Sequence, residues 1–322
     1  MASFADYYPP FWQFNGHVQT IFPSLFRKIP VPYQRERVEL PDGDFLDLDW
    51  ALVNNSKRTN KLVVVTHGLE GDSERHYVTG VIRKFFDNGI DGLGWNSRSC
   101  SGEINRLPRF YHHGDAEDLR FVVHHAIEKY GYNEIYLVGF SMGGSLTLRF
   151  LGEKPALLPK EVKKAVVASV PLDLPTSVAE LYKKGKRFYM ERFIKKLGVK
   201  IKQKSEIFPE NPLLSYEGYE KIKNFEEFDN RYTAPLHGYA DAPSFYEAAS
   251  AKPLLPFIAI PTLIIQAKND PFLSKECLDL GDGVSNKNLT LELPNKGGHV
   301  GFMQPRSKES YVEQRGFEFV EE

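Results

Sequence analysis

The sequence contains little cysteine, no excess of charge of either sign and no long apolar run. Cys100 and Cys277 are the only two cysteines in 322 residues. That number excludes a disulfide-stabilised scaffold and favours a reducing compartment. The formal net charge is -1, so no overall field attracts nucleic acid, and no nucleic-acid partner is expected. No stretch approaches the roughly 18 consecutive apolar residues that indicate a membrane span.

The N-terminal residues lack the features of a secretory signal. Such a signal has a basic start, a continuous apolar stretch and a cleavage site with small residues. Here Asp6, two prolines and Asn15 interrupt the apolar residues, and no positive charge precedes them. The sequence therefore predicts a cytoplasmic protein.

The composition is that of a globular protein with a large core, at 42% hydrophobic and 26% charged residues. Short β-branched or alternating segments predict strands, and apolar residues at helical spacing predict helices between them. Strands that alternate with helices indicate a mostly parallel sheet with helices on both faces. The predicted strands are 45–50, 62–66, 92–98, 135–141, 165–172, 262–268 and 289–293. The predicted helices are 76–87 and 115–130, and residues 142–148 are predicted to form the first part of a third helix.

The alternation stops between residues 174 and 255. This stretch is rich in aromatic residues and lysine and has no strand period. We interpret it as a mostly helical cap over the carboxyl edge of the sheet. The predicted domains are therefore a core of residues 1–173 and 256–322 and a cap insertion of residues 174–255.

Gly139-Phe140-Ser141-Met142-Gly143 matches the pattern G-x-S-x-G. It follows a predicted strand and precedes a predicted helix, which is the setting of the nucleophile elbow in the α/β-hydrolase fold. Small residues are needed there because the turn is strained and its neighbours approach closely. The pattern predicts this fold, with Ser141 as nucleophile.

A serine hydroxyl needs a base within hydrogen-bond reach to act as a nucleophile near neutral pH. The fold supplies its partners in the order serine, acid, histidine. His299 follows the predicted strand 289–293 in a loop with two glycines, NKGGHVGF. His237 lies in the proposed cap, where a structural or substrate-facing role is expected. We therefore predict His299 as the base.

The acid should follow the penultimate strand and accept the Nδ1–H of the histidine. Asp270 follows the strand 262–268 directly, in the turn Asn269-Asp270-Pro271. Asp173, after the preceding strand, is the alternative. Glu292 lies on a strand and is predicted to face outward. We favour Asp270.

An oxyanion hole needs two backbone N–H groups directed at the developing negative charge. Met142 follows the nucleophile and should provide one. The loop after strand 62–66 reads HGLEG, and Leu69 is the predicted second donor. His67 is expected to hydrogen-bond within its own loop.

Cofactor and metal motifs are missing from the sequence. It has no G-x-G-x-x-G, no phosphate-binding lysine after the elbow, and no H-E-x-x-H or paired-cysteine pattern. We therefore predict neither a cofactor nor a metal.

Three segments together resemble one branch of the α/β hydrolases, the YheT-like, embryogenesis-associated proteins. They are PPFWQFNGHVQTIFPSLFRK (9–28), SRSCSGEINRLPRFYHHGDAEDL (97–119) and YTAPLHGYADAPSFYEAAS (232–250). The resemblance implies a triad of Ser141, Asp270 and His299. The chain departs from the branch at Ser99, where glycine is usual, and at Asp115.

The resemblance also implies a carboxylic-ester hydrolase, and some relatives act on lipids. The many aromatic residues of the cap favour an uncharged ester with a short or medium acyl chain. The alternatives are an acylglycerol or phospholipid hydrolase and a non-catalytic ligand-binding homologue. An intact triad argues against the last.

Residues 183–204 hold ten basic residues and one acid, Glu191. A basic amphipathic helix can lie on an anionic membrane surface or meet an anionic substrate. The alternative, which we favour, is a cap helix whose apolar side packs inward and whose lysines are solvated.

Overall fold

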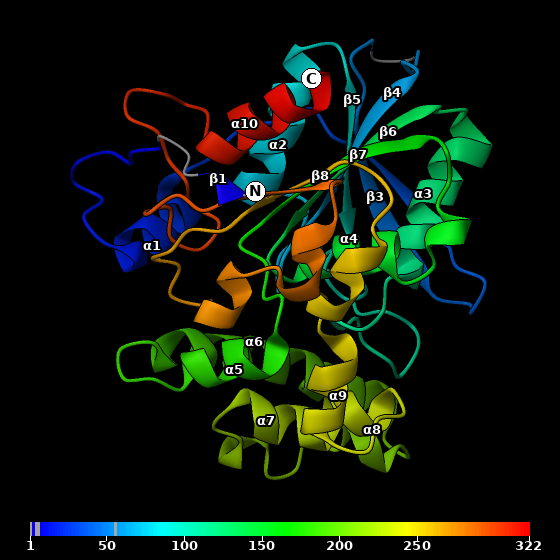
Figure 1. The fold of residues 1–322 in the computed structure, drawn as a ribbon. Helices are drawn as coiled ribbons and strands as arrows, with labels where there is room; N and C mark the ends of the chain where they lie inside the picture. Colours follow the sequence, from blue (N-terminus) through cyan, green and yellow to red (C-terminus); the bar gives the residue numbers. More distant parts are fainter. Residues whose placement is uncertain (1, 4–6, 55–56) are drawn as a thin grey trace.

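A computed structural model describes residues 2–3, 7–54 and 57–322. Its centre is a nine-stranded sheet with the order β1-β9-β8-β7-β6-β4-β5-β3-β2 (Figure 1). Strand β3 runs antiparallel to both of its neighbours, and the other neighbouring strands pair in parallel. The strands are β1 (Ala2–Ser3), β2 (Gln34–Glu39), β3 (Phe45–Ala51), β4 (Lys61–Thr66), β5 (Asp91–Asn96), β6 (Glu134–Phe140), β7 (Val162–Ala168), β8 (Thr262–Ile265) and β9 (Leu289–Glu292).

Helices cover both faces of this sheet, as the alternation of strands and helices predicts. The α-helices are α1 (Gly16–Phe26), α2 (His76–Asp87), α3 (Glu117–Tyr130), α4 (Met142–Gly152), α5 (Leu174–Leu181), α6 (Arg187–Ile207), α7 (Phe225–Phe228), α8 (Ala234–Leu236), α9 (Ala242–Ala249) and α10 (Tyr311–Glu321). The mostly parallel α/β-hydrolase architecture is confirmed.

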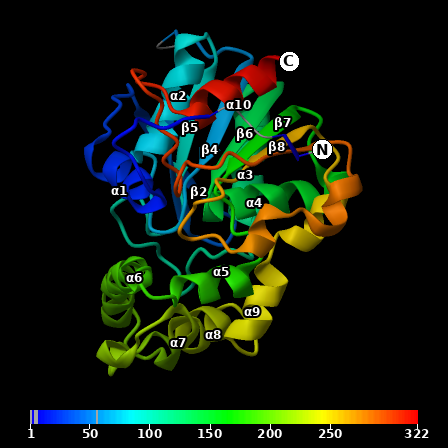
Figure 2. The ribbon, with the colours of Figure 1, turned by 60° about the vertical axis from the view of Figure 1, so that its left-hand side comes forward.

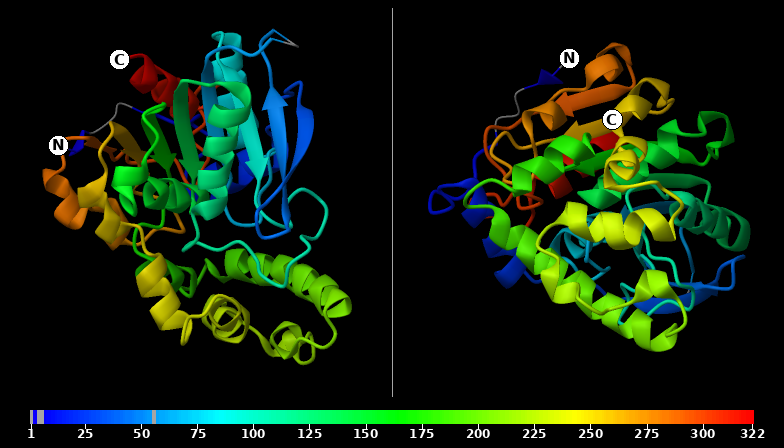
Figure 3. Two further views of the ribbon diagram at one scale, coloured as in Figure 1. Left: turned by 90° about the vertical axis from the view of Figure 1, so that its right-hand side faces the viewer. Right: turned by 90° about the horizontal axis from the view of Figure 1, so that it is seen from below.

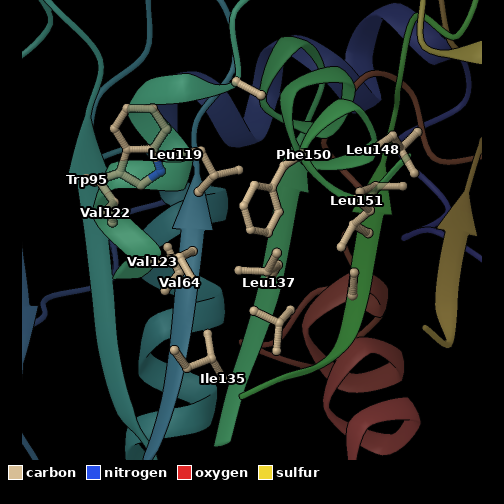
Figure 4. Packing of buried hydrophobic residues seen from close by; sticks show 14 of the residues in the cluster. Val64, Trp95, Leu119, Val122, Val123, Ile135, Leu137, Leu148, Phe150 and Leu151 are labelled. Carbon is tan, nitrogen blue, oxygen red and sulfur yellow. The ribbon is translucent and has the colours of Figure 1, made fainter. Parts of the chain in front are cut away.

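Alternate residues of the central strands point into two separate cores. On β4, Leu62 and Val64 pack with the side chains of α3 and α4, as Figure 4 shows for Val64. Val63 and Val65 point the other way and pack with α2 and α10. A parallel strand buried on both faces needs such a continuous apolar run.

The helix ends follow the local sequence. Helix α2 spans the residues predicted for it, and Gly89, with φ 83°, follows its end. Helix α3 ends at Gly131, whose φ of 74° is left-handed and whose N–H bonds back to the last turn. Glycine adopts this conformation without the steric cost of a Cβ.

Several boundaries differ from the predicted ones. Strand β7 stops at Ala168 because Ser169 takes a φ of 55°, and β8 stops at Ile265. Strands β1 and β2 and helices α1 and α10 were not predicted. The sequence of β2, QRERVE, is largely exposed and charged and has no clear apolar face.

The segment between β7 and β8 is helical, as predicted. All of residues 174–255 are described, and none of them forms a strand. In Figures 1 and 2, helices α5 to α9 form a separate layer beyond one end of the sheet. Figure 3 shows this layer from the side and from below. Ser141, which follows the carboxyl end of β6, faces a cavity lined by residues of this layer.

Candidate active site

Ser141 occupies a strained turn between β6 and α4. Its φ of 54° and ψ of -122° lie outside the regions that ordinary residues favour. The turn reverses the chain direction within one residue, so the side chain is presented at the sheet edge. This is the backbone geometry that the G-x-S-x-G pattern predicts.

The glycines around Ser141 are required by close backbone contacts. A Cβ on Gly143 would lie 2.3 Å from the carbonyl oxygen of Thr66, and one on Gly139 would lie 2.5 Å from that of Gly143. A Cβ on Gly144 would lie 2.5 Å from a methyl group of Val170. Helix α4 therefore packs against the sheet more closely than any larger residue permits.

A continuous hydrogen-bond chain joins Ser141, His299 and Asp270. The Oγ of Ser141 lies 2.9 Å from Nε2 of His299, and Nδ1 of His299 lies 2.9 Å from Oδ2 of Asp270. The side chain of Asp270 is fully buried and also accepts the N–H of Phe272 at 2.8 Å. These distances suit a nucleophile, a base and an orienting acid.

The ring of Phe272 stacks on the imidazole of His299. The centroids are 4.0 Å apart and the planes differ by 15°. The backbone after His299 is also held, because the N–H of Val300 donates to Oγ of Ser169 at 3.0 Å. The imidazole is therefore fixed by its neighbours as well as by Asp270.

Helix α1 holds the two loops that carry His299 and Asp270. Thr20 Oγ1 accepts the N–H of His299 at 2.8 Å. Gln19 Oε1 accepts from the N–H of Gly297 at 2.8 Å and from the side-chain amide of Asn269 at 2.9 Å. Sequence reasoning did not assign these residues a role. The one local sequence feature that indicates helix α1 is Asn15, whose side chain caps its first turn.

The loop after β4 lies against Ser141. A Cβ on Gly68 would be 3.1 Å from the Cβ of Ser141, and Leu69 and Met142 line the same cavity as Ser141. His67 holds this loop, as predicted: Nδ1 lies 2.7 Å from the carbonyl oxygen of Gly68, and Nε2 accepts the N–H of Ser97. Burial lowers the pKa of His67 to about 4, so this imidazole is neutral.

The alternative acid and histidine have structural roles. Asp173 caps α5 by accepting the N–H of Thr176. His237 links the helical layer to the chain between β5 and α3, with Nε2 2.9 Å from the carbonyl oxygen of Phe110. Neither side chain lies within hydrogen-bond distance of Ser141 among the described residues.

The prediction that Glu292 faces outward is wrong. Its side chain is buried at the end of β9 and accepts hydrogen bonds from Tyr311 Oη at 2.6 Å and Arg315 Nε at 2.8 Å. Both partners belong to α10, a helix that was not predicted. The ion pair with Arg315 balances the buried charge.

A cavity lies between Ser141 and the helical layer. Its walls are mostly apolar, including Leu174, Val178 and Phe228. Asp229 also lines it, inside a single π-helical turn, and accepts hydrogen bonds from Tyr246 at 2.7 Å and Thr233 at 2.5 Å. Burial raises the pKa of Asp229 to about 6.

Helix α6 covers this cavity and turns three of its lysines inward. Lys196, Lys200 and Lys204 follow one another at intervals of four residues and so share a face. Lys200 pairs with Glu70 at 2.7 Å, and Lys204 is buried and donates to the carbonyl oxygen of Asn105. The expectation that the lysines of residues 183–204 are solvated is therefore wrong for these three.

Across the described residues, no group of three or more His, Cys, Asp and Glu side chains could hold a metal ion. The helices there are also too short or too polar to cross a membrane.

Comparison with known proteins gives relatives along nearly the whole chain. The family model of the alpha/beta hydrolase fold matches residues 61–305. The Escherichia coli K12 protein named "Putative esterase YheT" is 34% identical over 94% of this chain and 88% of its own. Human "Phospholipase ABHD3" is 28% identical over 98% of this chain and 78% of its own.

The solved structures agree on the fold. An esterase of Pyrococcus furiosus, Pf2001, superimposes with a TM-score of 0.61 at 19% identity, covering 90% of this chain and 91% of that one. The sheet, the strained Ser141 turn and the matched sequences lead to one conclusion: the chain belongs to the α/β-hydrolase family, in its YheT-like branch.

Proposed function

We propose that this protein is a serine hydrolase that cleaves carboxylic esters through Ser141, His299 and Asp270. The observation that carries the proposal is the unbroken hydrogen-bond chain of these three side chains, which ends on a strained serine beside a mostly apolar cavity. A structural serine has no need of a strained backbone, a buried aspartate and an oriented imidazole together.

The first half of the reaction acylates the enzyme. As Ser141 Oγ attacks the ester carbonyl carbon, Nε2 of His299 takes the hydroxyl proton, and Asp270 stabilises the imidazolium. The tetrahedral intermediate collapses when the C–O bond to the alcohol breaks. The departing alcohol oxygen takes the proton from His299, which leaves an acyl group on Ser141.

The second half uses water in place of the alcohol. His299 removes a proton from water as its oxygen attacks the acyl carbon, then returns that proton to Ser141 Oγ as the carboxylic acid leaves. In both halves the backbone N–H groups of Leu69 and Met142 are the proposed donors to the oxyanion. Both residues line the cavity at Ser141, which supports this role.

We further propose that residues 174–255 act as the cap and that the cavity beneath it takes a short or medium acyl chain. Its apolar walls favour a hydrocarbon group over a charged one. The family relatives named esterase and phospholipase support ester cleavage as the reaction class.

Labelling with a fluorophosphonate tests the nucleophile. We expect the label on Ser141, and Ser141→Ala should lose both the label and roughly 10⁴-fold or more of the p-nitrophenyl butyrate hydrolysis. Ser145→Ala is the matched control: this buried serine lies one helical turn further along α4, and its hydroxyl has no partner among the described residues. Near-normal hydrolysis by a folded Ser141→Ala protein would contradict the proposal.

A further inference from the structure

The turn that carries Leu69 contains a strained residue. Residues 68–71 form this turn, which the N–H of Gly71 closes by donating to the carbonyl oxygen of Gly68 at 3.0 Å. Glu70 takes a φ of 54° within it, a left-handed value that favours glycine and costs other residues free energy. Such a conformation persists only where neighbouring groups hold it, so the partners of Glu70 decide the shape of the turn.

The direction of the Leu69 N–H depends on this turn. A trans peptide is planar, so the N–H of Leu69 points opposite to the carbonyl of Gly68. That carbonyl oxygen accepts the N–H of Gly71 and lies 2.7 Å from Nδ1 of His67. If the turn opens, the Gly68 carbonyl can rotate, and the Leu69 N–H rotates with it. The proposed donor to the oxyanion is therefore well placed only while the turn is closed.

The N–H, the carbonyl oxygen and the carboxylate of Glu70 all have partners outside the turn. Tyr111 Oη accepts the N–H of Glu70 and donates to its Oε1, both at 2.8 Å. Arg75 Nη2 and Lys196 Nζ donate to the carbonyl oxygen of Glu70 at 3.0 and 3.3 Å. Lys200 Nζ donates to Oε1 at 2.7 Å. Two of these four partners, Lys196 and Lys200, belong to helix α6 of the helical layer.

The ion pair of Lys200 and Glu70 is largely shielded from water. The two side chains are 13% and 5% exposed, so solvent screens their attraction less than that of a surface pair. Burial opposes the charge on Lys200, but the neighbouring groups Cys100 and Glu70 outweigh it, and the pKa of this ammonium group is raised. Without Lys200, a buried carboxylate one residue from Leu69 would be unpaired and would oppose negative charge on the oxyanion.

Helix α6 contacts the substrate space as well as this turn. The cavity between Ser141 and the helical layer is lined by Leu69 and, from α6, by Phe193, Leu197, Lys200 and Ile201. Leu69 also lines a smaller cavity beside Ser141, together with Arg75 and Lys196. The position of α6 over the cavity and the shape of the turn are therefore linked by the same lysines.

We propose that Lys200 is a positioning residue that couples helix α6 to the oxyanion hole. It holds the carboxylate of Glu70, keeps the turn of residues 68–71 closed, and so directs the N–H of Leu69 at the oxyanion. The inference rests on the proposed function and adds a residue to the same site. When α6 is displaced, the hydrogen bonds among Ser141, His299 and Asp270 persist, but the oxyanion hole loses one donor.

Kinetics on variants of Lys200 test the proposal, with p-nitrophenyl butyrate as substrate. Lys200→Met should lower kcat roughly 10- to 100-fold, part of the 10²- to 10³-fold that the loss of one oxyanion donor costs. KM should change little, because the donor acts mainly on the transition state. Lys200→Arg should retain most of kcat, because a guanidinium group can also pair with Glu70. The matched control is Lys202→Met, which removes an exposed charge from α6 and should leave kcat unchanged.

A double-mutant cycle shows whether Lys200 acts through Glu70. Glu70→Gln removes the charge but keeps an acceptor for Tyr111, and Glu70→Gln/Lys200→Met contains no unpaired charge from this pair. The double variant should therefore have a kcat at least as high as that of Lys200→Met, even if the single variant folds poorly. Losses that multiply as independent effects would overturn the proposal.

A transition-state analogue separates positioning of the oxyanion donor from a role in shaping the cavity. In a trifluoromethyl ketone, Ser141 Oγ adds to the carbonyl carbon, its proton passes to His299, and the carbonyl oxygen becomes an oxyanion. The corresponding secondary alcohol has the same shape and forms no oxyanion. In Lys200→Met the ketone should bind more weakly by about the factor by which kcat falls, and the alcohol should bind unchanged. Equal weakening of both would overturn the proposal.

The outcomes distinguish this inference from the proposed function. If the parent protein cleaves esters through Ser141 and Lys200→Met has the same kcat, the positioning role fails and the hydrolase stands. If the parent protein cleaves no ester and Ser141 takes no fluorophosphonate label, the proposed function fails, and the positioning role fails with it.

Discussion

The sheet edge and the helical layer hold their functional residues in different ways. At the sheet edge, Ser141 and its glycine neighbours are positioned by backbone against backbone, where contacts leave no room for a single added carbon. In the layer of residues 174–255, packing is mostly side chain against side chain, as where Gly198 of α6 faces the ring of Tyr219. Backbone contacts tolerate little change, whereas side chains can be exchanged. The chemistry should therefore be fixed by the first region and the substrate by the second.

The largest expected effect is a difference in kcat between variants of Asp270 and Asp173, the two candidates for the acid that orients His299. Asp270→Asn should lower kcat by roughly 10⁴-fold, because an amide can hold His299 in the wrong tautomer. Asp173→Asn should change kcat little, because asparagine caps a helix about as well as aspartate. Ester hydrolysis by the two variants, compared at equal folded fraction, measures the difference. The opposite ranking would assign the role of the acid to Asp173, at the start of α5.

A pair of glycine variants tests the contrast directly. Gly143→Ala should displace the Ser141 turn and lower kcat/KM by on the order of 10²-fold, because its Cβ would meet the carbonyl oxygens of Thr66 and His67. In Gly198→Ala the nearest atoms to the new Cβ belong to the ring of Tyr219, and the change should cost about 1–3 kcal/mol of the free energy of unfolding, with little change in kcat/KM. Urea unfolding and ester kinetics on both proteins give the two readouts. Equal losses of activity would break the distinction between the regions.

The buried Asp229 gives the helical layer its own pH dependence. Its pKa is about 6 in the folded protein, above the ordinary value of 3.8, so the folded state holds the proton more tightly than the unfolded state. The contribution of Asp229 to the free energy of unfolding should therefore fall by up to about 3 kcal/mol as the pH rises from about 4 to about 6. Asp229→Asn should lack this fall. Urea unfolding of the parent protein and of Asp229→Asn, measured across this pH range, gives the difference between their free energies of unfolding. A difference that stays constant with pH would refute the prediction.

The smallest effect is a graded one across substrates. With p-nitrophenyl esters from acetyl to palmitoyl, kcat/KM should rise by up to about fourfold for each added CH₂, since each buried CH₂ contributes about 0.8 kcal/mol. The value of kcat/KM should fall once the acyl chain is longer than the cavity between Ser141 and the helical layer. Preference for the longest chains, with a jump above the micelle threshold, would instead indicate a lipase.

The parts of the molecule that local sequence specifies were predictable. The bounds of α2 follow from apolar residues at helical spacing and a glycine after the last turn. The Ser141 turn follows from a strand, a short glycine-rich pattern and a helix start, and the order of strands brought His299 and Asp270 to the same edge. The catalytic roles of these three residues stay predictions until they are measured.

The parts that depend on distant contacts were not predictable. The burial of Glu292 depends on Tyr311 and Arg315 of a later helix. The inward lysines of α6 look like a solvated basic run in the sequence, and only the fold reveals the acceptors they reach. The smaller cavity beside Ser141 likewise combines residues of α1, the loop after β4, α6 and the loops that carry Phe272 and His299.

The bond from Thr20 to the backbone of His299 joins residues 279 positions apart. The loop of the predicted base is thus synthesised long after the helix on which it rests. An emerging polypeptide that already displays the Ser141 turn still lacks its base and the acid that orients it. We therefore expect a chain that stops before His299 to be inert toward esters, so that any hydrolytic capacity arrives in a single step once this residue has been made.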